Sequence, residues 1–368
     1  MIRSFGKSME AMVRKLRPHV LPSYRRAFSA LLARGMSERR EGEFVVCCDF
    51  ANQAIDHAGG RYYFGLVRDL IDAGYFPVFT ARRGTLSTFG TSSLKSLLLT
   101  ERLGVVRSFS EISKPFYLIT DDVSASPEGA EKIVLVDYEW RVCQAADELA
   151  FQFFVHPWVA KERAPETHEA RPSRLFFGGN TAEEKYDKDV IRDVYGMLSR
   201  REMLEVATQS ISSDHTFKPS DAAEWLSSSD RHPFVFCETQ RCKIPPSRWL
   251  EALTKADFFL ACPGVGMPLC HNVIEAMAAG CAPILQYSEY LSPPLKHGIN
   301  CLAFHDERSL ELVLNSIFSM TEDHIQRLRA GVRAYHEENL APGRFAHRLF
   351  SSPQKNRVML LNEYRVPR

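Results

Sequence analysis

The feature that most constrains the fold of this chain is a helical segment placed between two short apolar runs. The run "EFVVCCDF" (43–50) is followed by "RYYFGLVRDLIDAG" (61–74), which has helical periodicity, and then by "YFPVFTAR" (75–82). A helix that joins two buried strands makes them parallel neighbours in one sheet. The pattern therefore predicts an α/β protein built on a parallel sheet.

The same alternation continues through most of the 368 residues, a length that allows two domains. A polar, proline-bearing segment at 158–174 interrupts it and predicts a linker. We expect a domain at 41–165, a second at 170–340, and extensions at 1–40 and 341–368. The expected strands are 43–50, 75–82, 116–122, 132–138 and 150–157, then 175–180, 233–239, 256–264 and 281–287, with helices at 61–74, 246–255 and 268–279.

Charge and composition limit the classes of function that this chain can have. The chain has 45% hydrophobic residues, no apolar run of about 18 residues and an odd count of 9 cysteines, which favours a cytoplasmic protein with reduced thiols. Residues 1–40 carry a net charge of about +8, and the rest is near −7. Apolar residues at helical spacing in that basic segment fit either peripheral contact with an anionic membrane or a solvated helix packed on its own domain. The acidic remainder argues against nucleic-acid binding.

The stretch "ACPGVGMPLCHNVIEAMAAGCAPIL" (261–285) holds the strongest functional signal. Gly264 and Gly266 would let a ligand approach the backbone, and the free N–H groups of the next helix suit a diphosphate. On that helix, His271, Asn272 and Glu275 share one side. A carboxylate in this position suits two neighbouring hydroxyls, so Glu275 is interpreted as a ribose ligand.

This segment resembles the donor-binding segment of GT-B glycosyltransferases, which carry "EAMAxGxPVI" after a glycine-bearing loop; exostosin-like enzymes have a related motif. Glu275 matches the second of two glutamates of the retaining family, while Met267 stands where the first would fall. "HAGGRYYFGLVRDLIDAGYFPVF" (57–79) is similar to the GT-B opening, which implies that Gly59 and Gly60 face the donor or acceptor. The resemblance implies two Rossmann-like domains facing a central cleft, with the C-terminal tail crossing back to the first domain.

Catalysis would require a base near the sugar and cations on the departing diphosphate. Asp56 and His57 in the loop before the Gly-Gly turn, and His156 in "FVHP", are the candidate catalytic residues. Asn180, Lys185, Arg241 and Lys243 follow strands of the second half and are candidates for the diphosphate. Each has an ordinary alternative as a turn or solvated residue. We expect no metal and no cofactor beyond the nucleotide-sugar donor.

These features together predict a metal-independent GT-B glycosyltransferase that moves a sugar from a nucleotide sugar to a glycan or lipid-linked glycan. Family analogy alone points to bacterial surface polysaccharide synthesis, with the protein cytoplasmic or peripheral on the inner face of the membrane. Two alternatives remain open: a GT-B nucleotide-sugar epimerase, and a non-catalytic GT-B partner protein, which Met267 favours.

Overall fold

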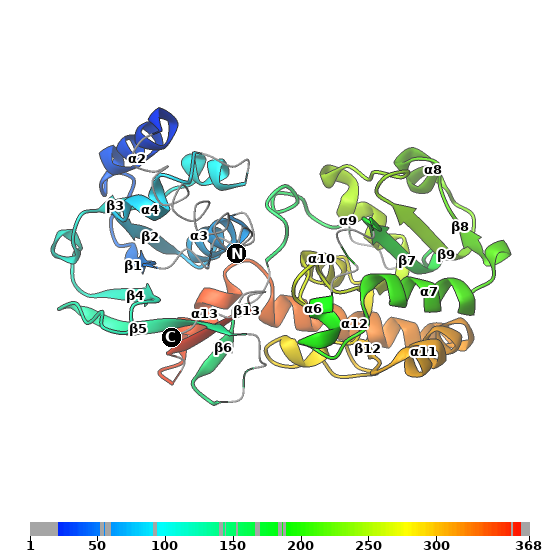
Figure 1. The fold of residues 1–368 in the computed structure, drawn as a ribbon. Helices are drawn as coiled ribbons and strands as arrows, with labels where there is room; N and C mark the ends of the chain where they lie inside the picture. The colour runs from blue at the N-terminus through cyan, green and yellow to red at the C-terminus, as the bar shows by residue number, and fades with distance from the viewer. Residues whose placement is uncertain are drawn as a thin grey trace, which may run out of the picture.

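A computed structural model describes residues 21–51, 55, 60–90, 94–139, 143, 145–151, 154–165, 170–182, 186, 189–354 and 356–361. Two parallel sheets form the centres of two α/β domains, which lie side by side in Figure 1. We call them the N-terminal and C-terminal domains. The predicted fold class, α/β with two Rossmann-like domains, is confirmed. The amphipathic pattern before residue 21 lies outside the described residues.

The seven-stranded sheet of the N-terminal domain has the order β3-β2-β1-β4-β5-β13-β6, with every pair parallel. The chain runs outward from β1 to β3 and then returns to the other side of β1 with β4. The strands are β1 (Phe44–Asp49), β2 (Tyr75–Thr80), β3 (Gly104–Val106), β4 (Phe116–Thr120), β5 (Ala130–Glu139), β6 (Glu148–Ala150) and β13 (Arg357–Leu361).

Helices α2 (Pro22–Arg34), α3 (Arg61–Asp72), α4 (Arg83–Leu86) and α13 (Arg344–Ser351) belong to the N-terminal domain, with 3-10 turns at Lys95–Thr100 and Phe109–Glu111. Helix α3 buries almost its whole circumference, including Tyr62, Phe64 and Leu66. Gly65 lets it pack closely, because a Cβ there would lie 2.2 Å from the ring of Phe154. Helix α2 packs on this domain through Ala27 and Leu31.

The six-stranded sheet of the C-terminal domain has the order β12-β11-β10-β7-β9-β8. Its strands are β7 (Ser173–Gly179), β8 (Thr216–Phe217), β9 (His232–Glu238), β10 (Ala256–Leu260), β11 (Ala282–Leu285) and β12 (Leu302–Ala303). Its helices are α6 (Asp189–Asp193), α7 (Arg200–Ser210), α8 (Ala222–Ser227), α9 (Pro246–Thr254), α10 (His271–Ala278), α11 (Glu307–Ser319) and α12 (Glu322–Asn339), with 3-10 turns at Ser213–His215 and Ser288–Tyr290.

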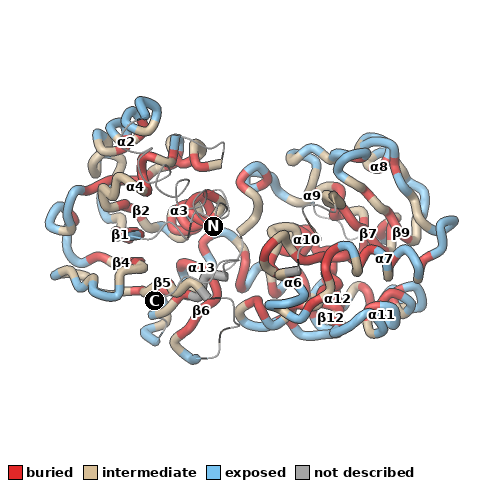
Figure 2. Tube along the Cα trace, in the orientation of Figure 1, coloured by how far each residue is buried: buried red, intermediate tan, exposed pale blue. Residues whose placement is uncertain are grey.

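Both sheets lie in the buried interior of their domains, and the exposed residues gather on the outer helices and loops (Figure 2). Apolar runs such as Phe258–Leu260 are buried throughout, as expected for strands covered on both faces. Two expectations were wrong in detail. The strand expected at 150–157 ends at Ala150, and the helix expected from residue 268 begins at His271 because residues 265–268 form a bend.

The chain crosses between the domains twice. The first crossing leads from β6 to β7 through 151–172, and the second joins α12 to α13. At the second crossing the buried carboxylate of Asp69 accepts hydrogen bonds from the backbone N–H groups of Gly343 (2.8 Å) and Ala346 (2.7 Å). These bonds fix the N-terminus of α13 to α3, and the chain then adds β13 between β5 and β6.

Candidate functional site

A cavity of about 300 Å³ lies at the carboxyl ends of β7 and β9, beside the N-terminal half of α10. Strand β7 stands where the strand order reverses, since β9 and β8 follow on one side of it and β10 to β12 on the other. Open parallel sheets bind ligands at such switch points. The lining of the cavity includes six residues predicted from the sequence: His156, Asn180, Lys243, His271, Asn272 and Glu275.

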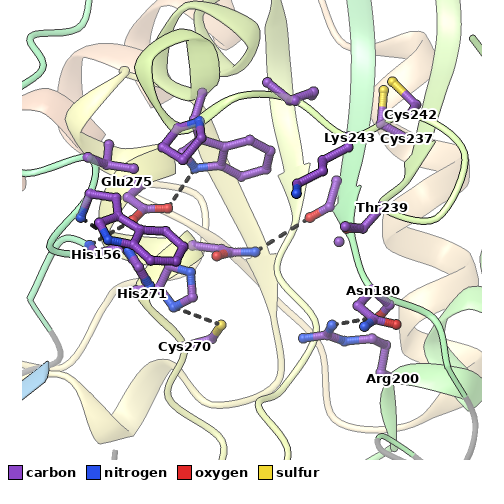
Figure 3. Close-up of a pocket in the computed structure, with 18 of the residues that line it drawn as sticks. His156, Asn180, Arg200, Cys237, Thr239, Cys242, Lys243, Cys270, His271 and Glu275 are labelled. Carbon is purple, nitrogen blue, oxygen red and sulfur yellow. Dashed lines mark hydrogen bonds between the residues drawn. The ribbon is translucent and has the colours of Figure 1, made fainter. Parts of the chain in front are cut away.

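Figure 3 shows His156, His271, Cys270 and Glu275 on one side of the cavity. Helix α10 supplies His271 and Glu275, its N-cap residue is Cys270, and the first crossing supplies His156. The Glu275 carboxylate is 1% exposed. It accepts a hydrogen bond from the backbone N–H of His156 (2.8 Å) and another from the indole Nε1 of Trp249 (2.6 Å). Burial raises the pKa of Glu275, and the hydrogen bonds from the His156 N–H and the Trp249 indole oppose that rise.

Both imidazoles on this side are held in their neutral form. The rings of His156 and His271 are 5.0 Å apart. Burial lowers the pKa of His156 to about 3 and that of His271 to about 4. The Nδ1 of His156 accepts from the N–H of Trp158 (3.2 Å), and the Nδ1 of His271 lies 3.4 Å from an Nη1 of Arg61, which can only donate. In each neutral ring the proton therefore sits on Nε2.

Figure 3 places Arg200, Asn180, Thr239 and Lys243 on the opposite side. Arg200, at the start of α7, is 5% exposed. It donates to the carbonyls of Asn180 (2.8 Å) and Pro263 (3.0 Å), and its guanidinium lies 3.8 Å from the ring centre of Tyr186. This packing holds a cation at the cavity wall. Lys243 is exposed to solvent and follows the turn after β9.

The other predicted residues are placed as follows. Gly60 adopts a left-handed conformation (φ 94°) at the start of α3, with its Cα beside Lys95. Gly264 lies in the loop before α10, where a Cβ would come within 2.9 Å of the Met267 carbonyl oxygen. Gly264, Gly266 and the exposed Arg241 are not among the lining residues of the cavity. Asp56, His57, Gly59 and Lys185 lie outside the described residues.

Several lining residues were missed by the sequence analysis. Arg200, Tyr186, Trp158 and Trp249 come from segments that carry no motif, and only their position in the folded chain brings them to the cavity. Met267 has its own role: its Sδ accepts from the Tyr62 hydroxyl (3.7 Å), so this residue contacts the N-terminal domain.

Among the described residues, no group of three or more His, Cys, Asp or Glu side chains could hold a metal ion. Within the same ranges, each helix is too short or too polar to cross a membrane.

No family model matches the chain, and no curated protein matches it. Solved structures do. An α-glucosyltransferase with UDP and a 13-mer DNA is 11% identical, with a TM-score of 0.39 over 83% of this chain and 98% of that one. HepE of Anabaena in complex with UDP is 10% identical, with a TM-score of 0.42 over 84% and 99%. WaaG, a glycosyltransferase of lipopolysaccharide biosynthesis, is 10% identical, with a TM-score of 0.33 over 84% and 100%. Similarities of this size do not bear on the ligand of this chain or on the roles of its residues.

Proposed function

We propose that this protein is a glycosyltransferase that binds a nucleotide sugar in the cavity between β7, β9 and α10. One observation carries the proposal. The cavity places the cations of Arg200 and Lys243 on one side, and the carboxylate of Glu275 with two neutral imidazoles on the other. Cations suit a diphosphate, and a carboxylate suits the two hydroxyls of a ribose. The rings of Trp158, Trp249 and Tyr186 offer apolar surface for a base or sugar.

In this proposal His156 and His271 act as hydrogen-bond donors through Nε2–H. The Nδ1 lone pair of His156 is already engaged by the Trp158 N–H. His156 is therefore better placed to donate to a sugar or phosphate oxygen than to take a proton from the acceptor. Asp56 and His57 stay as the candidate bases. The acceptor is proposed to be a glycan or lipid-linked glycan that enters from the N-terminal domain.

Thermal unfolding against UDP, GDP, CMP, ADP and dTDP tests the binding step. A nucleotide at about 100 times its Kd should stabilise the protein by about 2.7 kcal/mol. Lys243→Ala should weaken the binding of that nucleotide about tenfold, since the Lys243 ammonium group lines the cavity. Arg241→Ala is the matched control, because Arg241 is also exposed and only two residues away but is not among the lining residues. The absence of a shift from every nucleotide would overturn the proposal.

Turnover assays then distinguish a glycosyltransferase from an epimerase and from a non-catalytic partner protein. A glycosyltransferase transfers a labelled sugar from the identified donor only when an acceptor is present. An epimerase converts the donor sugar without an acceptor. A non-catalytic partner binds the nucleotide and does neither. Met267 favours the last alternative, because a thioether that contacts Tyr62 replaces the glutamate found at this position in the retaining family.

A further inference from the structure

Two cysteines flank a tight turn at the carboxyl end of β9. Cys237 is the penultimate residue of the strand, and Cys242 follows after four residues. The carbonyl of Glu238 accepts from the N–H of Arg241 (3.0 Å) and from that of Cys242 (2.7 Å). The chain therefore folds back at once and returns Cys242 to the side of Cys237.

The two thiols meet in the wall of the cavity described above. They lie close enough for each to influence the pKa of the other, and Figure 3 shows their sulfur atoms side by side. Both side chains line the cavity although they are nearly buried, at 1% and 2% exposed. The consecutive Cys47 and Cys48 lack this arrangement, since neighbouring residues of a strand point to opposite faces of the sheet.

We propose that Cys237 and Cys242 form a reversible disulfide in the wall of the cavity, with a small-molecule disulfide such as glutathione disulfide as the oxidant. Burial raises the pKa of both thiols, and for Cys242 the neighbouring Cys237 thiol partly offsets that rise. Cys242 is thus the first nucleophile. Its thiolate attacks the reagent and expels one glutathione thiolate; Cys237 then loses its proton, attacks the Sγ of Cys242 and expels the second. Two cysteines are oxidised and one glutathione disulfide is reduced to two thiols.

The disulfide would also change the cavity. A sulfur–sulfur bond of about 2.05 Å is shorter than a non-bonded contact between two thiols, so the turn must draw inward. Thr239 lies inside the closed loop and Lys243 directly follows it, and both line the cavity. We therefore predict that the oxidised protein binds the nucleotide at least tenfold more weakly than the reduced protein. This prediction rests on the proposed function.

Peptide mapping of the folded wild-type protein after treatment with glutathione disulfide tests the site directly. We expect a peptide cross-linked between Cys237 and Cys242 that disappears on reduction. Cys262→Ser, which removes another nearly buried cysteine, should leave the cross-link intact. Cys237→Ser should retain one glutathione on Cys242, because the resolving thiol is gone, and Cys242→Ala should give neither product.

A folded wild-type protein without this cross-linked peptide would overturn the proposal if the same reagent cross-links the urea-unfolded chain. Nucleotide affinity is then measured on the oxidised and reduced forms. Equal affinities would overturn the effect on binding. If the reduced protein binds no nucleotide, the proposed function fails, while the peptide map still decides the disulfide.

Discussion

At the scale of single residues, Glu275 joins three segments of the chain. Its two hydrogen-bond donors come from the first crossing and from α9, while the carboxylate itself belongs to α10. A buried carboxylate is costly unless such bonds compensate for the loss of water. Glu275 is proposed to bind the ribose of a nucleotide, and its two hydrogen bonds give it a structural function.

We predict that Glu275→Ala lowers the free energy of unfolding by about 3 kcal/mol or more, because two buried N–H donors lose a charged acceptor. Trp249→Phe removes only the indole donor and should cost less, about 1–2 kcal/mol. Urea denaturation measures both. An alanine variant as stable as wild type would contradict this account of Glu275. The Trp249→Phe variant also allows nucleotide binding to be measured with the carboxylate still present.

At the scale of elements, the two ends of α3 offer a matched pair of glycines. Gly60 before the helix (φ 94°) and Gly74 after it (φ 85°) both have a positive φ. A Cβ at Gly60 would lie 2.2 Å from the Cγ of Lys95, a residue with a buried side chain, whereas nothing lies within 4 Å of a Cβ at Gly74. Alanine costs about 1–2 kcal/mol at a left-handed position through backbone strain alone.

We therefore predict that Gly60→Ala destabilises the protein more than Gly74→Ala does, by a further 1 kcal/mol or so, since only Gly60 adds a collision to the backbone strain. Thermal or urea unfolding of the two variants measures the difference. Equal losses would mean that Lys95 moves aside without cost, and the turn before α3 would then require glycine only for its backbone angle.

The last turn of α12 carries a pH-sensitive group next to the second crossing. Burial lowers the pKa of His336 to about 4 from its usual value near 6.5. A charged histidine at a helix C-terminus gains only about 0.3–1 kcal/mol from the helix dipole, so burial prevails. Below pH 6.5 the unfolded chain binds a proton that the folded chain refuses. The stability supplied by neutral His336 is therefore present above pH 6.5 and is lost as the pH falls toward 4.

We predict that wild type loses about 1–2 kcal/mol relative to His336→Gln between pH 7.5 and pH 5, since glutamine cannot titrate. Comparing the two proteins cancels the contributions of the other titrating groups. Urea unfolding at several pH values gives the comparison. A difference that does not change with pH would show that His336 keeps its ordinary pKa in the folded protein.

Local pattern allowed most central elements to be predicted, because strands such as β1, β7 and β10 each contain a short apolar run. The short β3, with three residues, gives no such signal. Strand β13 cannot be predicted locally at all, since its partners β5 and β6 lie about 200 residues earlier in the chain. Helix α10 is also shorter than the helix predicted from residue 268, because the bend at 265–268 replaces the first predicted turn.

The candidate site divides in the same way. Glu275, His271 and Asn272 lie on one helix with a recognisable motif, so their spacing predicts a shared face. Arg200 and Trp249 reach the cavity from α7 and α9, and only tertiary packing decides where those helices lie. Cys242 lies beside Cys237 because of the turn after β9, and no sequence pattern predicts the hydrogen bonds of that turn.

At the scale of the whole molecule, the C-terminal segment completes the N-terminal domain. After α12 the chain leaves the C-terminal domain, forms α13 and ends its described part as β13 (Figure 1). Strand β13 pairs in parallel with β5 along five residues and with β6 along three. The Arg357 guanidinium contacts the Asp137 carboxylate at 2.7 Å. The strand is internal to the sheet, so the N-terminal domain depends on residues from the far end of the chain.

Removing every residue after 355 should therefore destabilise the N-terminal domain selectively. The truncation deletes β13, leaves β5 with an unpaired edge and separates β6 from the sheet. We predict that amide hydrogen exchange becomes faster in β1, β4 and β5 while β7, β9 and β10 keep their protection. A chain ending at Leu361 retains β13 and is the control. If both truncated chains keep wild-type protection in β5, the pairing of β13 contributes no stability to this domain.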